Sequence, residues 1–375
     1  MPGLIQHSEI FPIKNILLSI SEYKNSCSTI RAMKIKISMP GDYPSADLTQ
    51  FLGTRMSSHE FYFNCPIESA DAWFIIEGTL PNDTKCLVPE NRVFFLGAET
   101  ARSVGFYYET PGWLEYLKQF AGIYSPQELF WKNAVTSIPF LPWMINSNHG
   151  PNHFAKSSRD IDFFRNLNSL EKTREISVFC SSQYMTADHR ARFRFVSALK
   201  DYFGTRLDWF GNGINPLKQK WDGLAPYKYT IVLENQSSSW VLTEKIQGAF
   251  LALAVPIYWG APQVKDIFSD KAFVSIDIKD LKGSIALIEE LLERDDYELR
   301  LSSLIEAKTI VTDKLNFLFR IEKILEDSSL QDPVRPVIKT ISPLDYFTPS
   351  PHLVDKVIRK VFPTLSKILR RLRRI

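Results

Sequence analysis

The best candidates for chemistry in this chain follow a short apolar run at 229–233, which predicts a buried strand. Glu234 and Asn235 come directly after that run. In α/β sheets, ligands bind outside the carboxyl ends of the strands. We therefore expect these two polar side chains to face a ligand.

A helix is predicted to begin shortly afterwards, over 243–254, with Thr243 as its capping residue. Backbone N–H groups at a helix N-terminus attract phosphate, and Lys245 in the first turn would add a full positive charge. Lysine opposes the helix dipole at that end, so an anionic ligand would turn this conflict into attraction. Glu244 could accept hydrogen bonds from ribose hydroxyls. An ordinary capped helix with an exposed Glu and Lys is the alternative.

Three arginines, Arg190, Arg192 and Arg194, stand together on a second predicted helix at 189–203. This helix follows a predicted strand at 175–182, so its first turn would lie near the carboxyl end of that strand. Guanidinium groups make forked contacts with phosphate oxygens. A solvated basic surface is the alternative, and we expect at least one of the three to be solvated.

Strands and helices alternate along the chain in two sets. The first set has strands at 33–38, 71–78 and 91–100, with helices at 46–51 and 113–125. A polar stretch at 146–172 is the predicted linker. The second set has further strands at 207–213, 227–235, 255–260 and 272–277, and helical stretches at 281–326. This order predicts an α/β fold with a mostly parallel sheet in each half, so we expect two Rossmann-like domains facing across a cleft.

Four motifs of the second half occur in a specific order: Tyr-Lys-Tyr at 227–229, Glu-Asn at 234–235, Thr-Glu-Lys at 243–245 and Val-Pro-Ile-Tyr-Trp-Gly at 255–260. They resemble the signature of the α-1,3/4-fucosyltransferases, glycosyltransferase family 10. The resemblance implies the two-domain GT-B fold. It also implies inverting transfer of L-fucose from GDP-β-L-fucose to an N-acetylglucosamine or glucose unit.

The same resemblance implies roles for individual residues. Asn235 would lie near the nucleotide, Glu244 would bind the ribose of the nucleotide sugar, and Lys245 would bind the diphosphate. Arg192 stands where the family has a phosphate-binding arginine. Many members have a tyrosine two residues before Thr-Glu-Lys; here that residue is valine, and the neighbouring Trp240 is the candidate replacement.

The resemblance further implies that Glu99 is the general base, since the family shows a Gly-Glu motif after the equivalent strand. Here the motif reads Gly-Ala-Glu, with one residue inserted. A carboxylate facing a cleft can take the proton of an attacking hydroxyl. Glu109 is the second candidate, and an exposed loop acid is the alternative interpretation of Glu99. The aromatic stretch 106–113 could stack on sugar rings or belong to the core.

Metal-ligand patterns are weak in this chain. Asp160 and Asp162 match a DxD pattern but lie in the predicted linker, and a Gly-Pro pair separates His149 from His153. The four cysteines are scattered, as free thiols in a reducing compartment would be. We therefore expect no required metal or other cofactor, with cationic side chains neutralising the leaving diphosphate.

The C-terminal segment 353–375 has one apolar helical stripe and a basic opposite face. Residues 356–375 contain eight Lys or Arg and no Asp or Glu, whereas the rest of the chain is net negative. Such a helix suits an anionic membrane surface; docking on the body or on a partner is the alternative. With no signal peptide and no apolar run of membrane-spanning length, we expect a cytoplasmic, peripherally membrane-associated protein without a nucleic-acid partner.

These inferences divide the chain into three regions: an acceptor-binding domain at 1–155, a GDP-fucose-binding domain at 156–330, and a C-terminal segment at 331–375 that carries the membrane-associating tail. Two other functions stay open. One is a GT-B transferase that uses another nucleotide sugar, because the residues named above would hold any diphosphate. The other is a non-catalytic nucleotide-sugar-binding protein at the membrane.

Overall fold

The computed structural model describes residues 32–39, 49–53, 59–77, 80, 82–98, 111–127, 129, 133–146, 159–182, 187–326 and 332–347. The predicted general base Glu99, its alternative Glu109 and the basic amphipathic tail lie outside these ranges. The four residues predicted to bind the nucleotide sugar all lie within them.

Six parallel strands form the first sheet, in the order β2-β1-β3-β5-β6-β7. Its central strands β3 and β5 are buried along their whole length, as expected for a parallel sheet that is covered on both faces. The helices of this half are α2 (Thr49–Leu52) and α4 (Pro111–Leu117). The strands are β1 (Lys34–Ser38), β2 (Glu60–Phe63), β3 (Ala72–Ile76), β5 (Val93–Leu96), β6 (Gly122–Ser125) and β7 (Ala134–Thr136).

The helix predicted over 113–125 is wrong in its second half. Helix α4 ends at Leu117, and residues 122–125 are strand β6 of the first sheet. Apolar spacing fits a helix as far as Phe120, but Gly122 breaks the pattern and Ile123 is fully buried beside β5. The sheet contacts therefore outweigh the helical periodicity of the preceding turns.

The predicted linker also contains structure of its own, helix α5 (Ile161–Asn166). Asp160 caps this helix, because its carboxylate accepts a hydrogen bond from the Phe163 backbone N–H at 2.9 Å. Asp162 lies 3.7 Å from Arg165 on the same helix. The DxD pattern is thus the beginning of a helix.

Five parallel strands form the second sheet, in the order β12-β11-β10-β8-β9, and most elements predicted for this half are confirmed. Strand β10, the source of the candidate site, is central and buried. The strands are β8 (Arg174–Phe179), β9 (Leu207–Phe210), β10 (Tyr227–Leu233), β11 (Val255–Trp259) and β12 (Val274–Ser275). The helices are α6 (Ala187–Phe203), α7 (Glu244–Leu251) and α8 (Val264–Ile267), with 3-10 turns η3 (Gly204–Arg206) and η4 (Lys220–Gly223).

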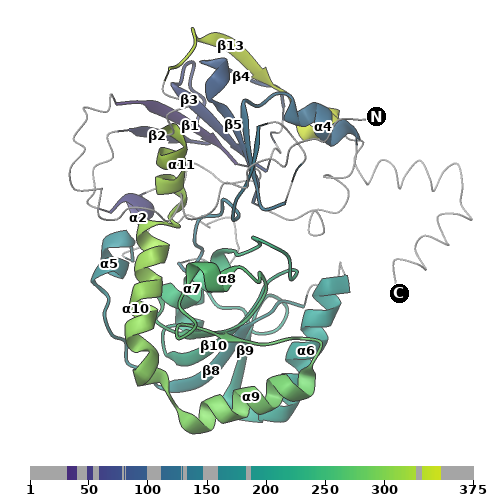
Figure 1. Cartoon of the computed structure of the whole chain (residues 1–375), viewed down its shortest axis with the longest axis vertical. Coiled ribbons are helices and arrows are strands. Elements are labelled where there is room, and N and C mark those ends of the chain that lie inside the picture. The colour runs from purple at the N-terminus through teal and green to yellow at the C-terminus, as the bar shows by residue number, and fades with distance from the viewer. Residues whose placement is uncertain are drawn as a thin grey trace, which may run out of the picture.

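Three helices, α9 (Leu281–Arg294), α10 (Tyr297–Asp313) and α11 (Phe317–Glu326), follow the second sheet. Helix α10 packs against α5 and α7, whereas α11 packs against α2, so the chain crosses back to the first domain between them (Figure 1). Strand β13 (Val337–Ile341) then pairs antiparallel with β4 (Thr84–Val88), and a 3-10 turn, η6 (Leu344–Tyr346), contacts α4. The α/β class with one parallel sheet in each domain, expected of the GT-B fold, is confirmed.

Buried side chains fix the crossing between α10 and α11. The amide of Asn316, which is fully buried, donates to the carbonyl of Phe51 at 2.8 Å. Arg320 donates to the carbonyls of Pro139 and Ile138, both at 2.7 Å. No helix in the described ranges is long and apolar enough to cross a membrane.

Candidate active site

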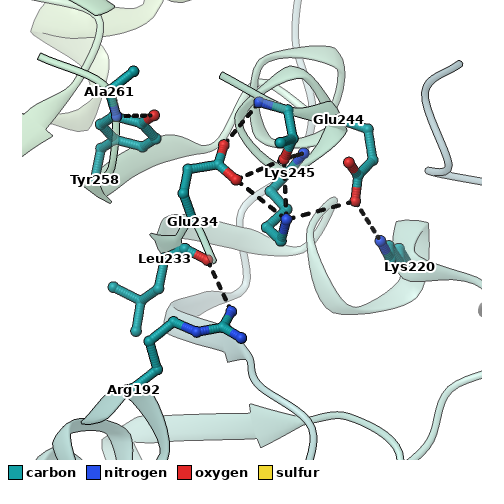
Figure 2. Close-up of polar contacts among 9 residues, drawn as sticks. Arg192, Lys220, Leu233, Glu234, Glu244, Lys245, Tyr258 and Ala261 are labelled. Atoms are coloured by element: carbon teal, nitrogen blue, oxygen red, sulfur yellow. Dashed lines mark hydrogen bonds and ion pairs between the residues drawn. The ribbon is translucent and has the colours of Figure 1, made fainter. Parts of the chain in front are cut away.

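Glu234 joins the end of β10 to the beginning of α7 (Figure 2). It is fully buried, and its carboxylate accepts hydrogen bonds from the Thr243 backbone N–H at 2.9 Å and the Thr243 hydroxyl at 2.7 Å. A third contact comes from Lys245 Nζ at 3.2 Å. A buried carboxylate needs such partners, so Glu234 holds the helix start against the strand end.

Thr243 is the N-cap of α7, as the sequence predicts; its hydroxyl oxygen accepts from the Lys245 backbone N–H at 3.4 Å. Helix α7 is buried along almost its whole length, and it packs against β10, β11 and α10. Its N-terminus therefore points toward the carboxyl edge of the second sheet.

Lys245 lies between two carboxylates. Its Nζ is 3.2 Å from Glu234 Oε2, 3.9 Å from Glu244 Oε1 and 3.0 Å from the Thr243 hydroxyl. The side chain of Lys245 is 26% exposed, whereas those of Glu234 and Glu244 are 0% and 6% exposed. The cation is thus the part of this cluster that solvent, or an anionic ligand, can reach.

Glu244 has a second cation close to it, Lys220 on η4. The distance from Lys220 Nζ to Glu244 Oε1 is 3.8 Å, and the lysine side chain is 14% exposed. Burial lowers the pKa of Lys220 to about 8, although Glu244 opposes this shift. Sequence reasoning missed Lys220, because nothing in its local pattern separates it from the exposed Lys218 nearby.

Arg192 reaches the same strand end from α6. Its Nη1 donates to the carbonyl of Leu233 at 3.3 Å, and Leu233 directly precedes Glu234 (Figure 2). One turn earlier on α6, burial and the positive charges of Arg192 and Lys245 lower the pKa of His189. The two cations predicted to hold a diphosphate therefore come together at the end of β10. Arg194 is exposed, as expected for at least one of the three arginines.

Asn235 and Trp240 belong to the loop between β10 and α7. Asn235 is half-buried directly after Glu234. Val241 is 2% exposed and belongs to the core, whereas Trp240 is partly exposed. The backbone of Trp240 has φ of +66°, a left-handed conformation that is uncommon for a residue with a side chain.

A cavity of about 40 Å³ lies beside this cluster, and Lys220, Glu244 and Lys245 line it together with Ile145, from the segment that joins the two sheets. A larger groove of about 450 Å³ lies beside the opposite end of the second sheet. The charged residues that line this groove, Arg174, Glu175, Arg206 and Asp208, pair with one another. The candidate residues Glu244 and Lys245 therefore line the smaller cavity and not the larger groove.

Strand β5 of the first sheet is followed by Gly97 and Ala98, and Glu99, the next residue in the sequence, lies outside the described residues. The Ala98 backbone N–H donates to the carboxylate of Glu77, so a side chain of the adjacent strand end holds this loop. In the parts of the chain that the structure describes, no three His, Cys, Asp or Glu residues gather as a metal site would require. Cys65, Cys86 and Cys180 are free thiols.

Comparison with known proteins finds a family match within the second domain. Residues 170–301 match the family described as glycosyltransferase family 10 (fucosyltransferase), C-terminal part. Over 76 residues, the chain is 37% identical to the alpha-(1,3)-fucosyltransferase FucT of Helicobacter pylori. This alignment covers 20% of the chain and 16% of the length of that curated relative.

Solved structures to which this chain is similar include two of an alpha1,3-fucosyltransferase. The one with GDP is 18% identical, with a TM-score of 0.47, over 84% of this chain and 96% of that one. The one with GDP-fucose is 19% identical, with a TM-score of 0.46, over 79% and 91%. An alpha-glucosyltransferase in complex with UDP and DNA is 11% identical, with a TM-score of 0.47, over 78% and 100%.

The family match covers the elements that carry Arg192, Asn235, Glu244 and Lys245. The resemblance seen in the sequence is therefore confirmed over residues 170–301, which match the C-terminal part of glycosyltransferase family 10, the fucosyltransferase family.

Proposed function

We propose that this protein transfers L-fucose from GDP-β-L-fucose to a hydroxyl of an N-acetylglucosamine or glucose unit in a glycan, in α-1,3 or α-1,4 linkage and with inversion of the anomeric centre. The observation that carries the proposal is the convergence of Arg192 and Lys245 on consecutive residues of one strand end, inside the family 10 domain. The second domain would hold the donor and the first domain the acceptor.

The donor would bind at the N-terminus of α7. Lys245 and Arg192 would hold the diphosphate, because both are cations placed where phosphate also meets the backbone N–H groups of a helix start. Glu244 would accept hydrogen bonds from the ribose hydroxyls, and Asn235 would lie beside the nucleotide. In this arrangement a phosphate oxygen takes over part of the contact that Lys245 makes with Glu234.

The reaction is a single displacement. The acceptor oxygen forms a bond to the anomeric carbon of fucose, while the bond from that carbon to the β-phosphate oxygen breaks. Glu99 takes the proton of the acceptor hydroxyl, and GDP leaves with the bonding electrons. Cations aimed at the leaving phosphate stabilise this developing charge. Lys245 and Arg192 supply two, so we propose that no metal is required; unchanged turnover in EDTA is the expected result.

A panel of nucleotide sugars tests the proposal directly. The protein would be assayed with GDP-fucose, GDP-mannose and UDP-sugars against N-acetylglucosamine- and glucose-containing acceptors, with linkage analysis of any product. We expect transfer from GDP-fucose alone. A preference for GDP-mannose or a UDP-sugar would favour a transferase of another specificity.

Replacing the proposed base separates an enzyme from a binding protein. We expect Glu99→Gln to reduce kcat by about 10²- to 10⁴-fold, the usual contribution of general base catalysis, while the Kd for GDP stays unchanged. Glu109→Gln tests the second candidate base; if Glu99 is the base, this variant should keep its turnover. A wild-type protein that binds GDP-fucose without any turnover would favour the non-catalytic alternative.

We also propose that the protein is cytoplasmic and attaches to an anionic membrane surface through its basic C-terminal segment. A chain cut after Ser350 should no longer sediment with phosphatidylserine-containing vesicles, whereas the whole chain should. Neither should bind vesicles of neutral lipid. Sedimentation of the shortened chain with the anionic vesicles would refute this attachment.

A further inference from the structure

Lys220 is a buried cation whose position has no role in the function proposed so far. Its Nζ is 3.8 Å from Glu244 Oε1, and Lys245 Nζ approaches the same oxygen at 3.9 Å. One carboxylate oxygen therefore lies between two ammonium groups, with Lys245 on one side and Lys220 on the other (Figure 2). The side chains of Lys220 and Glu244 are both mostly buried, at 14% and 6% exposure.

The two lysines differ in their other partners. Lys245 also contacts Glu234 and the Thr243 hydroxyl, and it is the more exposed of the two. A diphosphate that draws Lys245 toward itself weakens the contact of Lys245 with Glu244. A buried carboxylate left without a cation tends to take up a proton, because desolvation disfavours its charged form. Lys220 would stay beside Glu244 at that moment.

Lys220 owes its position to the segment that joins the two domains. The backbone N–H of the next residue, Trp221, donates to the carbonyl of Ile145 at 2.9 Å. The guanidinium of Arg159 lies 4.9 Å from the Trp221 ring, and the ring of Phe163 packs edge-on against it at 5.7 Å. Through Trp221, the turn that carries Lys220 thus contacts both Ile145 and the later residues Arg159 and Phe163 of the segment between the two sheets.

We propose that Lys220 is a positioning residue of the donor site: it keeps the Glu244 carboxylate ionised and directed at the ribose while Lys245 binds phosphate, and it couples this carboxylate to the segment that joins the domains. The inference rests on the donor site proposed above.

This role is pH-dependent. Burial lowers the pKa of Lys220 to about 8, and the charged groups that act on it are Glu244, Lys245 and Glu234. Lys220 is therefore charged below about pH 8 and neutral above it. Its support of Glu244 is present at pH 7 and is lost as the pH rises through 8.

Calorimetric titration with GDP at pH 7.0 and pH 8.8 tests the inference. Four proteins are compared: wild type, Lys220→Met, Lys220→Arg and the control Lys218→Met, whose lysine is exposed. At pH 7.0 we expect Lys220→Met to bind GDP about 10-fold more weakly than wild type, since it removes one partner of the mostly buried Lys220–Glu244 ion pair. At pH 8.8 the wild type should lose most of its advantage over Lys220→Met. Lys220→Arg, which stays charged, should keep its affinity at both pH values.

The outcomes separate the two proposals. A folded wild type that does not bind GDP contradicts the proposed function. A wild type that binds GDP, with Lys220→Met equal to it at both pH values, overturns the role of Lys220. If Lys220→Met does not fold, the comparison of wild type with Lys220→Arg decides. The same loss of GDP affinity at pH 8.8 in wild type and in Lys220→Arg would also overturn the role of Lys220.

Discussion

The cations of the candidate site and the buried Arg320 at the crossing between the domains have different partners. Lys245 and Lys220 lie close to carboxylates, at the carboxyl edge of the second sheet. Arg320 instead donates to two main-chain carbonyls and to the hydroxyl of Ser137, and its guanidinium lies 3.6 Å from the ring centre of Phe140. Lys308, on α10 within the second domain, likewise donates to main-chain carbonyls, those of residues 165 and 167.

These cations differ in whether a ligand can replace their present hydrogen-bond or ion-pair partners. A main-chain carbonyl belongs to the fold, so a cation held by carbonyls cannot leave without exposing buried acceptors. A carboxylate contact can be replaced in part by a phosphate oxygen, which carries the same sign of charge. Arg320 is therefore suited to holding the domains together, and the cations at the candidate site are suited to binding an anion.

Arg320→Met should give the largest effect. It leaves two carbonyls and a hydroxyl without their buried donor, so we expect a loss of about 3–5 kcal/mol in the free energy of unfolding, measured in urea. Lys323→Met, which removes an exposed lysine of the same helix, should cost less than about 1 kcal/mol. The folded fraction of Arg320→Met should bind GDP with the wild-type Kd. A tenfold weaker Kd would mean that the two regions are coupled.

Lys245→Ala should instead weaken GDP binding strongly and reduce stability only a little. We expect the Kd for GDP to rise about 10- to 100-fold, as for loss of a charged hydrogen-bond donor, and stability to fall by less than in Arg320→Met. Lys265→Ala removes an exposed lysine of the short helix α8 and should leave the Kd unchanged. Unchanged GDP affinity in Lys245→Ala would count against its contact with phosphate.

Lys172 should give the smallest effect, as a pH dependence of stability. It donates to the carbonyls of Ala225 and Ala252, both at 2.8 Å, and burial lowers its pKa to about 7. An unfolded lysine titrates near 10.4, so between these values the unfolded state binds more protons. Stability should therefore rise with pH above about 7, by no more than about 1.4 kcal/mol per pH unit from this group.

Urea unfolding at pH 6.5 and pH 8.5 measures this dependence. The rise should be smaller in Lys172→Met than in wild type, and Lys279→Met, at an exposed site, should behave as wild type. Equal slopes in all three proteins would show that Lys172 keeps an ordinary pKa in the folded state.

Most of the second domain could be predicted from the sequence, because its elements are long and their patterns are local. Strand β10 is an unbroken apolar run, and Thr243 caps α7 where the polar loop ends. Parallel strands present their carboxyl ends at one edge of a sheet, so the sequence also predicts that Arg192 and Lys245 lie near the same edge. The first domain was less predictable: β6 follows a helical pattern that only Gly122 interrupts, and β13 pairs with a strand about 250 residues earlier.

The sequence by itself determined the order of strands and helices in the second domain, the capped start of α7 and the cations that would meet a phosphate, because these depend on neighbouring residues. Only the tertiary structure decided that Glu234 would join β10 to α7, and that Lys220, from a different turn, would stand beside Glu244. These contacts depend on how separate segments of the chain pack against one another, and no local sequence pattern encodes that packing.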